Sequence, residues 1–179
     1  TLGSQFWSAT GTTFYFTIVT VTLETILGFW MAIIMARTFR GRSLVRAAVL
    51  VPWAIPTAVT AQLWLFIFAF EGIGNKLFNT TILWTGSEIP ARWAVIIADT
   101  WKTTPFMALL ILAGLQMIPA EVYEAAKVDG ASAWQRFRMI TLPLVKPALM
   151  VAILFRTLDA LRMFDLPYIL TEGSNNTTT

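Results

Sequence analysis

The sequence contains no cysteine and no histidine, and only 13% of its 179 residues are charged. The first absence excludes disulfides and thiolate metal sites, and the second removes the commonest proton shuttle at neutral pH. The net charge of +3 is too small to favour a nucleic-acid partner. What the sequence has instead is apolar: 56% of the residues are hydrophobic, eight are tryptophan, and the mean hydropathy is +0.67. This composition is typical of a helical bundle whose outer surface faces lipid.

Motifs that would carry enzyme chemistry are also missing. The sequence has no glycine-rich phosphate loop, no nucleophile triad, no cluster of metal-binding carboxylates and no internal repeat. We therefore expect no catalysis, no cofactor and no metal on this chain. The chain begins with Thr1 and has no start or stop device at either end, so we interpret it as an interior fragment of a longer protein, in which a signal peptide cannot be judged.

Four apolar stretches are long enough to cross a membrane, whose hydrocarbon core requires about 20 apolar residues. They run over residues 14–36, 47–70, 93–117 and 147–166. The second stretch contains Pro52 and Pro56, so we expect a kinked helix whose freed carbonyls are satisfied by neighbouring helices. The kink is either a simple bend or a hinge. The sequence therefore predicts an all-α, polytopic membrane bundle, with residues 1–179 forming a single transmembrane domain.

The charges of the loops predict the orientation of these spans. Four arginines and no acidic residue follow the first span, which indicates a cytoplasmic loop. They are Arg37, Arg40, Arg42 and Arg46. The loop 71–92 and the turn-rich end 171–179 then fall on the outer side, and the four spans alternate without conflict. Asn79, Asn175 and Asn176 begin triplets that fit a glycosylation acceptor, a pattern that is common by chance.

A polar interval, residues 121–143, separates the third span from the fourth and begins with a short helix. Pro119 can occupy its first helical position, and Glu121 lies in its first turn, where the helix dipole favours negative charge. Gly130 is a natural C-terminal stop. The predicted helix of about ten residues is marginal alone in water, so it needs a partner.

A second short helix is predicted to follow. Ser132 and Gln135, three residues later, form a capping-box pattern that restarts the helix. Leu142 precedes Pro143 and is therefore expected outside helical geometry, which ends this second helix. We expect the two short helices to meet at an angle around Gly130.

The first short helix has a low, smooth side. Ala125 and Ala126, beside Glu124, would let the backbone of another protein come close. Such a side fits a docking element, and it equally fits an ordinary amphipathic loop that lies in the membrane interface. The shape alone does not separate these two interpretations.

The residue order around this side resembles the EAA loop of the membrane subunits of ATP-driven ABC importers. Each fixed position of that pattern is filled here: Glu124, Ala125, Ala126, Gly130, Ile140, Leu142 and Pro143. In that family the loop is the coupling helix, which seats in a cleft of the cytoplasmic ATPase subunit. The resemblance implies a cytoplasmic coupling loop over residues 118–143. It also implies contacts to the ATPase from this EAA set together with Glu121 and Asp129.

The chain beyond the loop is similar to the carbohydrate branch of this family, the maltose and trehalose type I importers, most tightly over residues 99–171. The similarity implies a multi-pass permease of a bacterial inner membrane that imports a sugar such as trehalose or maltose. Its implied partners are a second permease, two ATPases that bind ATP and Mg²⁺, and an extracytoplasmic lipoprotein that binds the solute. Full members have about six or more spans, so at least one would be missing at each end. Residues 172–175 replace the usual GGP-type turn, as in trehalose-type members.

Charged residues inside spans cost about 2.5 to 3.5 kcal/mol each to insert, so they normally face a cavity or a partner. Asp99 and Lys102 are three residues apart, which makes them neighbours on one helix face, where their charges can neutralise each other. Arg156, Asp159 and Arg162 repeat this spacing in the fourth span. These charges either form a structural ion-pair network or line a polar path for a hydroxyl-rich solute.

Aromatic residues near these charges extend the candidate path. Trp101, Phe106 and Phe164 lie close to the charges in sequence, and Trp101, beside Asp99, is the best candidate for stacking on a sugar ring. Most other tryptophans lie near the predicted span ends, as in an interfacial belt. In the first span, Glu24 shares a helix face with two threonines and a glycine, which indicates a close helix contact around a hydrogen-bonded acid, with a proton relay as the alternative.

Three other interpretations remain open. An ABC permease for a non-sugar solute, such as glycerol phosphate or a polyol, would carry the same loop. A secondary transporter or ion channel would use the same intramembrane charges but would need neither the EAA loop nor ATP. A membrane scaffold would explain the spans and the docking helix but not the charges. A second EAA-bearing permease, a Walker-motif ATPase and a lipoprotein binding protein encoded nearby would distinguish the importer from these alternatives.

Overall fold

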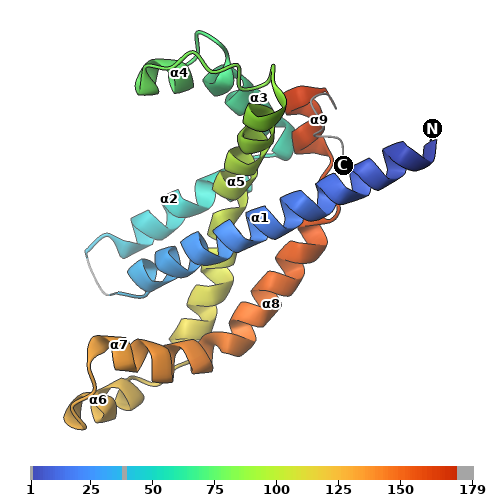
Figure 1. Cartoon of the computed structure of the whole chain (residues 1–179). Helices are drawn as coiled ribbons and strands as arrows, with labels where there is room; N and C mark the ends of the chain where they lie inside the picture. The colour runs from blue at the N-terminus through green and yellow to red at the C-terminus, as the bar shows by residue number, and fades with distance from the viewer. Residues whose placement is uncertain (1, 38–39, 173–179) are drawn as a thin grey trace.

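The computed structural model describes residues 2–37 and 40–172, and every regular element within these ranges is a helix, which confirms the all-α fold class (Figure 1). In chain order the elements are α1 (Leu2–Ala36), α2 (Arg42–Ala54), α3 (Thr57–Phe68), α4 (Ile73–Phe78), α5 (Glu88–Gln116), α6 (Ala120–Val128), α7 (Ala133–Arg136), the π-helix η1 (Phe137–Thr141), α8 (Leu142–Ala160) and α9 (Asp165–Thr171). The predicted outer end, residues 173–179 with Asn175 and Asn176, lies outside the described residues.

Among the described helices, three are long and apolar enough to cross a membrane: Gly3–Ala36, Glu88–Gln116 and Ala133–Ala160. They correspond to the first, third and fourth predicted spans. The fourth span starts well before residue 147, because its helix begins at the capping box of the polar interval. It also ends at Ala160 rather than near residue 166, because the chain turns before α9.

The second predicted span is a broken helix rather than a kinked one. α2 ends at Ala54 and α3 begins at Thr57, and the two helices are bent by 93° relative to each other. Ile55 between them is extended, as expected for a residue that precedes proline. Its carbonyl has no helical partner and instead accepts a hydrogen bond from the Lys102 ammonium on α5. The prediction that a neighbouring helix satisfies a freed carbonyl is therefore confirmed.

α5 lies between α1 and α8, and it packs most extensively against α1 (Figure 1). Small residues set the closest approaches in this bundle. A Cβ atom added at Gly28 of α1 would lie 2.8 Å from that of Met107 on α5. A Cβ added at Gly114 of α5 would lie 2.4 Å from that of Ala148 on α8. Glycine at these two points lets the helix backbones approach each other, as in many membrane bundles.

The loop between α3 and α5 is organised by Asn75 at the start of α4. Its buried side-chain amide donates to the carbonyls of Phe70 and Ile82 at 3.0 and 2.9 Å. Its side-chain oxygen accepts hydrogen bonds from Thr80 and Trp84. This loop lies at the same end of the bundle as α9 and the N-terminus, opposite α6 and α7 (Figure 1). The arrangement agrees with the predicted alternation of the spans.

The predicted break before Pro143 is wrong. Leu142 has helical angles, φ −63° and ψ −45°, and α7, η1 and α8 follow one another without interruption. The N–H of Leu142 bonds to the carbonyl of Phe137, five residues earlier, as in a π-helix. This wider turn gives room to a proline ring that would otherwise clash with the preceding turn of an α-helix. The result is one continuous helix from Ala133 to Ala160.

Candidate functional site

A buried ion cluster joins three helices of the bundle. Its centre is Arg156 of α8, which is only 1% exposed. The guanidinium donates to Glu24 of α1 at 2.6 and 3.1 Å, to Asp159 at 3.1 Å, and also to Asp99 of α5. Thr103 of α5 donates a further hydrogen bond to Glu24 at 2.6 Å. The cluster therefore connects α1, α5 and α8 through charged hydrogen bonds.

This cluster lies well inside the membrane-spanning part of the bundle. At the usual rise per residue, Asp99 is about 16 Å beyond the start of α5 at Glu88. Charges at such depth are tolerated when they are paired and hydrogen-bonded, as Arg156 is here through four bonds to carboxylates. The predicted structural ion-pair network is confirmed for Arg156 and its partners.

Glu24 reaches the cluster because α1 and α5 approach each other closely. Gly28, one turn further along α1, makes the tight contact with Met107, and Thr20, one turn earlier, is fully buried. The predicted close helix contact around a hydrogen-bonded acid is therefore confirmed. The sequence did not indicate that Arg156, far away in the chain, is the partner of Glu24.

A polar cavity of about 140 Å³ lies beside the cluster. Six of the eight residues predicted to form a solute path line this cavity. They are Asp99, Lys102, Arg156, Asp159, Arg162 and Phe164. Thr57, Thr103 and Asp165 also line the cavity, although the sequence analysis did not single them out. Thr103 lies one turn from Asp99 on the same face, a spacing that would have indicated it.

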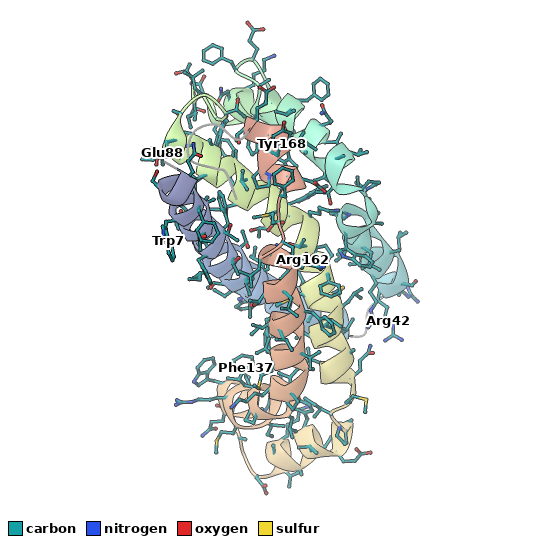
Figure 2. All side chains as sticks on the ribbon, turned by 90° about the vertical axis from the view of Figure 1, so that its right-hand side faces the viewer. Trp7, Arg42, Glu88, Phe137, Arg162 and Tyr168 are labelled. Carbon is teal, nitrogen blue, oxygen red and sulfur yellow. The ribbon has the colours of Figure 1, made fainter. Side chains whose placement is uncertain are left out.

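Two of the side chains that line the cavity are mostly exposed. Those of Asp159 and Arg162 are 61% and 80% exposed and lie 4.0 Å apart. Figure 2 shows Arg162 at the upper end of α8, with Phe137 at the lower end of the same continuous helix and Tyr168 above, on α9. Exposed charges next to apolar spans do not face lipid, so this side of the cavity faces water or another polypeptide.

Lys102 and Asp99 do not neutralise each other as predicted. Asp99 bonds to Arg156 instead, and Lys102 donates to the carbonyl of Ile55 at the break between α2 and α3. A carbonyl freed by a helix break inside a membrane needs a donor, and a lysine one helix away supplies it. The lysine therefore joins α5 to the broken second span while it lines the cavity.

Trp101 and Phe106 do not line the cavity, contrary to the prediction. Trp101 is two residues from Asp99, which turns it to the other side of α5, where it lines an apolar groove with Trp30 and Trp93. Phe106 stacks on Trp53 of α2, with ring centroids 5.8 Å apart. Phe164 is the only one of the three predicted aromatic residues that lines the polar cavity.

The polar interval forms the short helix α6, as predicted. Glu121 lies in its first turn, but Pro119 is the N-cap rather than the first helical residue. Gly130 has a φ of +78°, a left-handed conformation that glycine adopts without strain. The N–H of Ala131 bonds to the carbonyl of Ala126 at 2.9 Å, which closes a Schellman motif around Gly130. The predicted helix stop is confirmed.

The predicted capping box that starts α7 is also confirmed. The N–H of Gln135 donates to the Ser132 hydroxyl at 3.3 Å, and the N–H of Ser132 donates to the Gln135 side chain at 2.7 Å. The second helix is not short, however, since it continues through η1 into α8. The two helices of the interval are thus α6 and the foot of a long spanning helix.

The smooth side of α6 is open to the surroundings. Glu124 and Ala125 are exposed, as are Glu121 and the C-cap residue Asp129, while Ala126 is half-buried. Of the other four residues of the EAA pattern, Gly130, Leu142 and Pro143 are exposed and Ile140 is half-buried.

Apolar side chains around α6 are also exposed. Val128 is 88% exposed, and Trp134 and Met139 are largely exposed as well. No group of three or more acidic side chains close enough to hold a metal ion occurs among residues 2–37 and 40–172.

The chain is similar in sequence to several transport permeases. It is 49% identical over 174 residues to the trehalose/maltose transport system permease protein MalF of Thermococcus litoralis, an alignment that covers 94% of this chain and 59% of that protein. It is also 49% identical over 174 residues to the trehalose transport system permease protein SugA of Mycobacterium tuberculosis, covering 96% and 56%. The chain therefore spans somewhat more than half the length of these relatives.

A solved structure shares the fold. The crystal structure of a bacterial ABC transporter involved in the import of the acidic polysaccharide alginate superposes with a TM-score of 0.84 at 23% identity, over 97% of this chain and 64% of that one. Residues 24–179 match the family described as the binding-protein-dependent transport system inner membrane component. With its long apolar helices, the chain is part of a multi-pass membrane protein, and it belongs to this family of binding-protein-dependent transport system inner membrane components.

Proposed function

We propose that this chain is the larger part of a permease subunit of an ATP-driven sugar importer, a transport component that carries no catalytic chemistry of its own. One observation carries the proposal. A single uninterrupted helix, Ala133–Ala160, follows directly after the exposed EAA helix at one end and places Arg156 in the ion cluster beside the polar cavity near its other end. Such a helix would link the turn after the docking surface to a solute path without a break in the helix.

The docking surface would be the exposed side of α6, where Glu124 and Ala125 stand free. Exposed apolar residues next to a polar segment, here Val128, Trp134 and Met139, are typical of a protein interface. A stable interface buries more than about 1,000 Å² in total, which is large for a nine-residue helix. We therefore infer that residues 134–138 and a second permease complete the contact with a cytoplasmic ATPase, which would hold ATP and Mg²⁺.

The polar cavity would form part of the solute path. Its buried wall, Arg156 with Asp99, is engaged in holding helices together. Its exposed side, Asp159 and Arg162, offers charges and hydrogen-bond donors to a hydroxyl-rich solute. A second permease subunit placed against this side would enclose the path, since exposed charges do not face lipid. Each half would then contribute one wall of an alternating-access pathway.

The solute class follows from the relatives. Two relatives at 49% identity are named for trehalose or for trehalose and maltose, and one at 41% is named for sulfoquinovosyl glycerol, a sugar derivative. We infer a disaccharide such as trehalose or maltose, delivered by an extracytoplasmic binding protein to a permease in a bacterial inner membrane. A non-sugar solute such as a polyol or glycerol phosphate is the alternative outcome of the test.

The test uses the full-length protein, reconstituted in proteoliposomes with its cognate ATPase, second permease and binding protein. ATP-dependent uptake of labelled trehalose or maltose is expected, and uptake of glycerol phosphate or a polyol alone would favour the alternative. Glu124→Lys, on the exposed side of α6, and Gly130→Pro, at a φ that proline cannot adopt, should uncouple ATP hydrolysis from uptake while the protein still inserts. Unchanged uptake in both variants would contradict the docking role.

The cavity is tested by Asp159→Ala combined with Arg162→Ala. Both side chains are mostly exposed, so their removal should impair transport and leave the assembly with the ATPase intact. A purified complex that falls apart would mean that the two residues hold the structure together instead. Tyr15→Phe, a conservative change on α1 whose ring contacts Arg92, serves as the control, because neither residue lines the cavity.

A further inference from the structure

α6 is held to the rest of the chain by very few contacts. No residue of α6 is fully buried, and no other described helix packs extensively against it. Figure 1 shows α6 and α7 extending from the lower end of the bundle. The half-buried side of α6 consists of Tyr123 and Ala126, three residues apart on one helix face. Whatever fixes the direction of α6 therefore acts through this face or through the turns that precede and follow it.

Tyr123 connects this face directly to the foot of the long helix. Its hydroxyl lies 2.8 Å from the hydroxyl of Thr141, the last residue of η1, which is buried. The Thr141 hydroxyl also lies 3.5 Å from the carbonyl oxygen of Arg136, one π-turn earlier. If Thr141 donates to that carbonyl, it is left to accept the proton of Tyr123, so both hydroxyls are used. The bond thus ties α6 to the π-turn that precedes Pro143.

The turn between α6 and α7 is also closed by hydrogen bonds. The Schellman motif around Gly130 is followed by the capping box of Ser132, and the side chain of Arg136 bonds to the carbonyl of Ala131. Together with the Tyr123 bond, these contacts form a closed ring of bonded segments that runs from α6 through α7 and η1 and back. A ring of this kind restrains the movement of α6 relative to α8.

Above the ring, α8 packs tightly against α5 where Ala148 meets Gly114. At Gly114 of α5, even a Cβ atom would overlap that of Ala148 on α8. Thr141 lies about 10 Å along the helix on one side of this contact, and Arg156 about 12 Å on the other. Arg156 is bonded to Asp99 of α5 and Glu24 of α1, so a rotation of α8 about the Gly114–Ala148 contact acts directly on the bonds of the ion cluster.

We propose that Tyr123 and Thr141 are positioning residues that make α6 and α8 move as one body about the Gly114–Ala148 contact. A displacement of α6 then reaches Arg156 and the polar cavity instead of being absorbed at the turn. This proposal rests on the proposed function, in which an ATPase displaces α6. The hydrogen bond does not take part in solute binding or in ATP hydrolysis. It determines how much of the displacement of α6 reaches the polar cavity.

The first test compares Tyr123→Phe and Thr141→Val in the reconstituted full-length complex. Each removes one hydroxyl and keeps the size of the side chain. Losing a hydrogen bond of ordinary strength should lower the solute transported per ATP hydrolysed by about two- to tenfold, with ATPase assembly unchanged. The double variant should be no worse than either single variant, because the same bond is lost. Unchanged ratios, or additive losses, would overturn the proposal.

Matched controls separate this effect from general damage. Tyr15→Phe removes a tyrosine hydroxyl while the ring keeps its contact with Arg92. Thr22→Val removes an exposed hydroxyl that bonds only within α1, to the carbonyl of Ile18. Both controls should keep the wild-type ratio of solute to ATP. A loss in the controls equal to that in the test variants would overturn the assignment to the Tyr123–Thr141 bond.

A rescue experiment tests the rigid body itself. The sequence has no cysteine, so Tyr123→Cys with Thr141→Cys can be bridged by a bifunctional thiol reagent about as long as a tyrosine side chain. We expect the unbridged double variant to be uncoupled and the bridged form to regain the wild-type ratio. Transport that stops on bridging would show that α6 must swing relative to α8, which would refute the proposal.

The failure of this proposal can be told apart from the failure of the proposed function. Ala125→Arg places a long charged side chain on the docking side of α6 without touching the Tyr123 bond. If Ala125→Arg weakens ATPase assembly but Tyr123→Phe leaves the ratio unchanged, only the positioning role is wrong. If Ala125→Arg and Glu124→Lys both leave assembly and uptake unchanged, α6 neither binds the ATPase nor transmits its movement, and both proposals fail.

Discussion

Replacement of Arg156 by methionine should be the most damaging single change to the bundle. Methionine keeps the apolar stem but removes the guanidinium, which leaves Glu24 and Asp99 buried without a counter-ion. Removing one partner of a buried ion pair costs about 3–5 kcal/mol. Because two buried carboxylates lose the same partner here, we expect the free energy of unfolding to fall by about 5 kcal/mol.

A second set of variants shows whether unpaired charge causes this loss. Glu24→Gln with Asp99→Asn, added to Arg156→Met, removes both charges but keeps side-chain size and hydrogen-bonding groups. The triple variant should regain about half of the lost stability or more, since neutral amides are cheaper to bury than unpaired carboxylates. Asp159→Asn serves as the control: its side chain is 61% exposed, so we expect a loss below about 1 kcal/mol.

The assay is equilibrium unfolding of the full-length protein in mixed micelles with increasing SDS, followed by tryptophan fluorescence and linear extrapolation. The eight tryptophans of this chain supply the signal. A loss below about 1 kcal/mol for Arg156→Met, or a triple variant no more stable than the single one, would refute the reasoning that paired buried charges hold α1, α5 and α8 together.

Three further changes test other contacts of the fold. Gly114→Ala should destabilise the bundle by about 1–3 kcal/mol, because the new Cβ would lie 2.4 Å from that of Ala148, whereas Gly11→Ala, with open space around it, should be neutral or stabilising in the same SDS assay. Lys102→Met should leave the Ile55 carbonyl unpaired and speed amide hydrogen exchange between α2 and α3; unchanged exchange there would contradict this role. Asn75→Ala should expose the loop 70–86 to limited proteolysis while the spanning helices stay protected, and a loop that remains resistant would show that Asn75 does not organise it.

Features that depend on local sequence were predictable. The helix stop at Gly130 and the capping box at Ser132 involve residues within one or two turns of each other, so the spacing alone determines them. The continuation through Pro143 was not predicted, because the rule for the residue before proline assumes ordinary helical geometry. The π-turn at residues 137–141 removes the clash on which that rule depends.

The candidate site was predicted in its members but not in its pairing. The cost of charge in a membrane identified Asp99, Lys102 and Arg156. It did not identify the partners, since Glu24 and Asp99 come from helices far from Arg156 in sequence, and several pairings satisfy the same composition. The position of Trp101 was misjudged for a different reason. Closeness in sequence to Asp99 was given more weight than helical periodicity, which turns the two side chains apart.

The length of the helix that carries Arg156 has a consequence for what can touch its lower end. From Arg156 down to Leu142, α8 extends for about 21 Å, and η1 and α7 continue from its lower end to one side (Figure 1). Half a bilayer, headgroups included, is only about 20–22 Å thick. An arginine near the middle of the membrane would therefore place the lower end of α8 at the headgroups, with η1, α7 and α6 at or beyond them. Trp134 and the α6 helix beside it would then be within reach of soluble macromolecules.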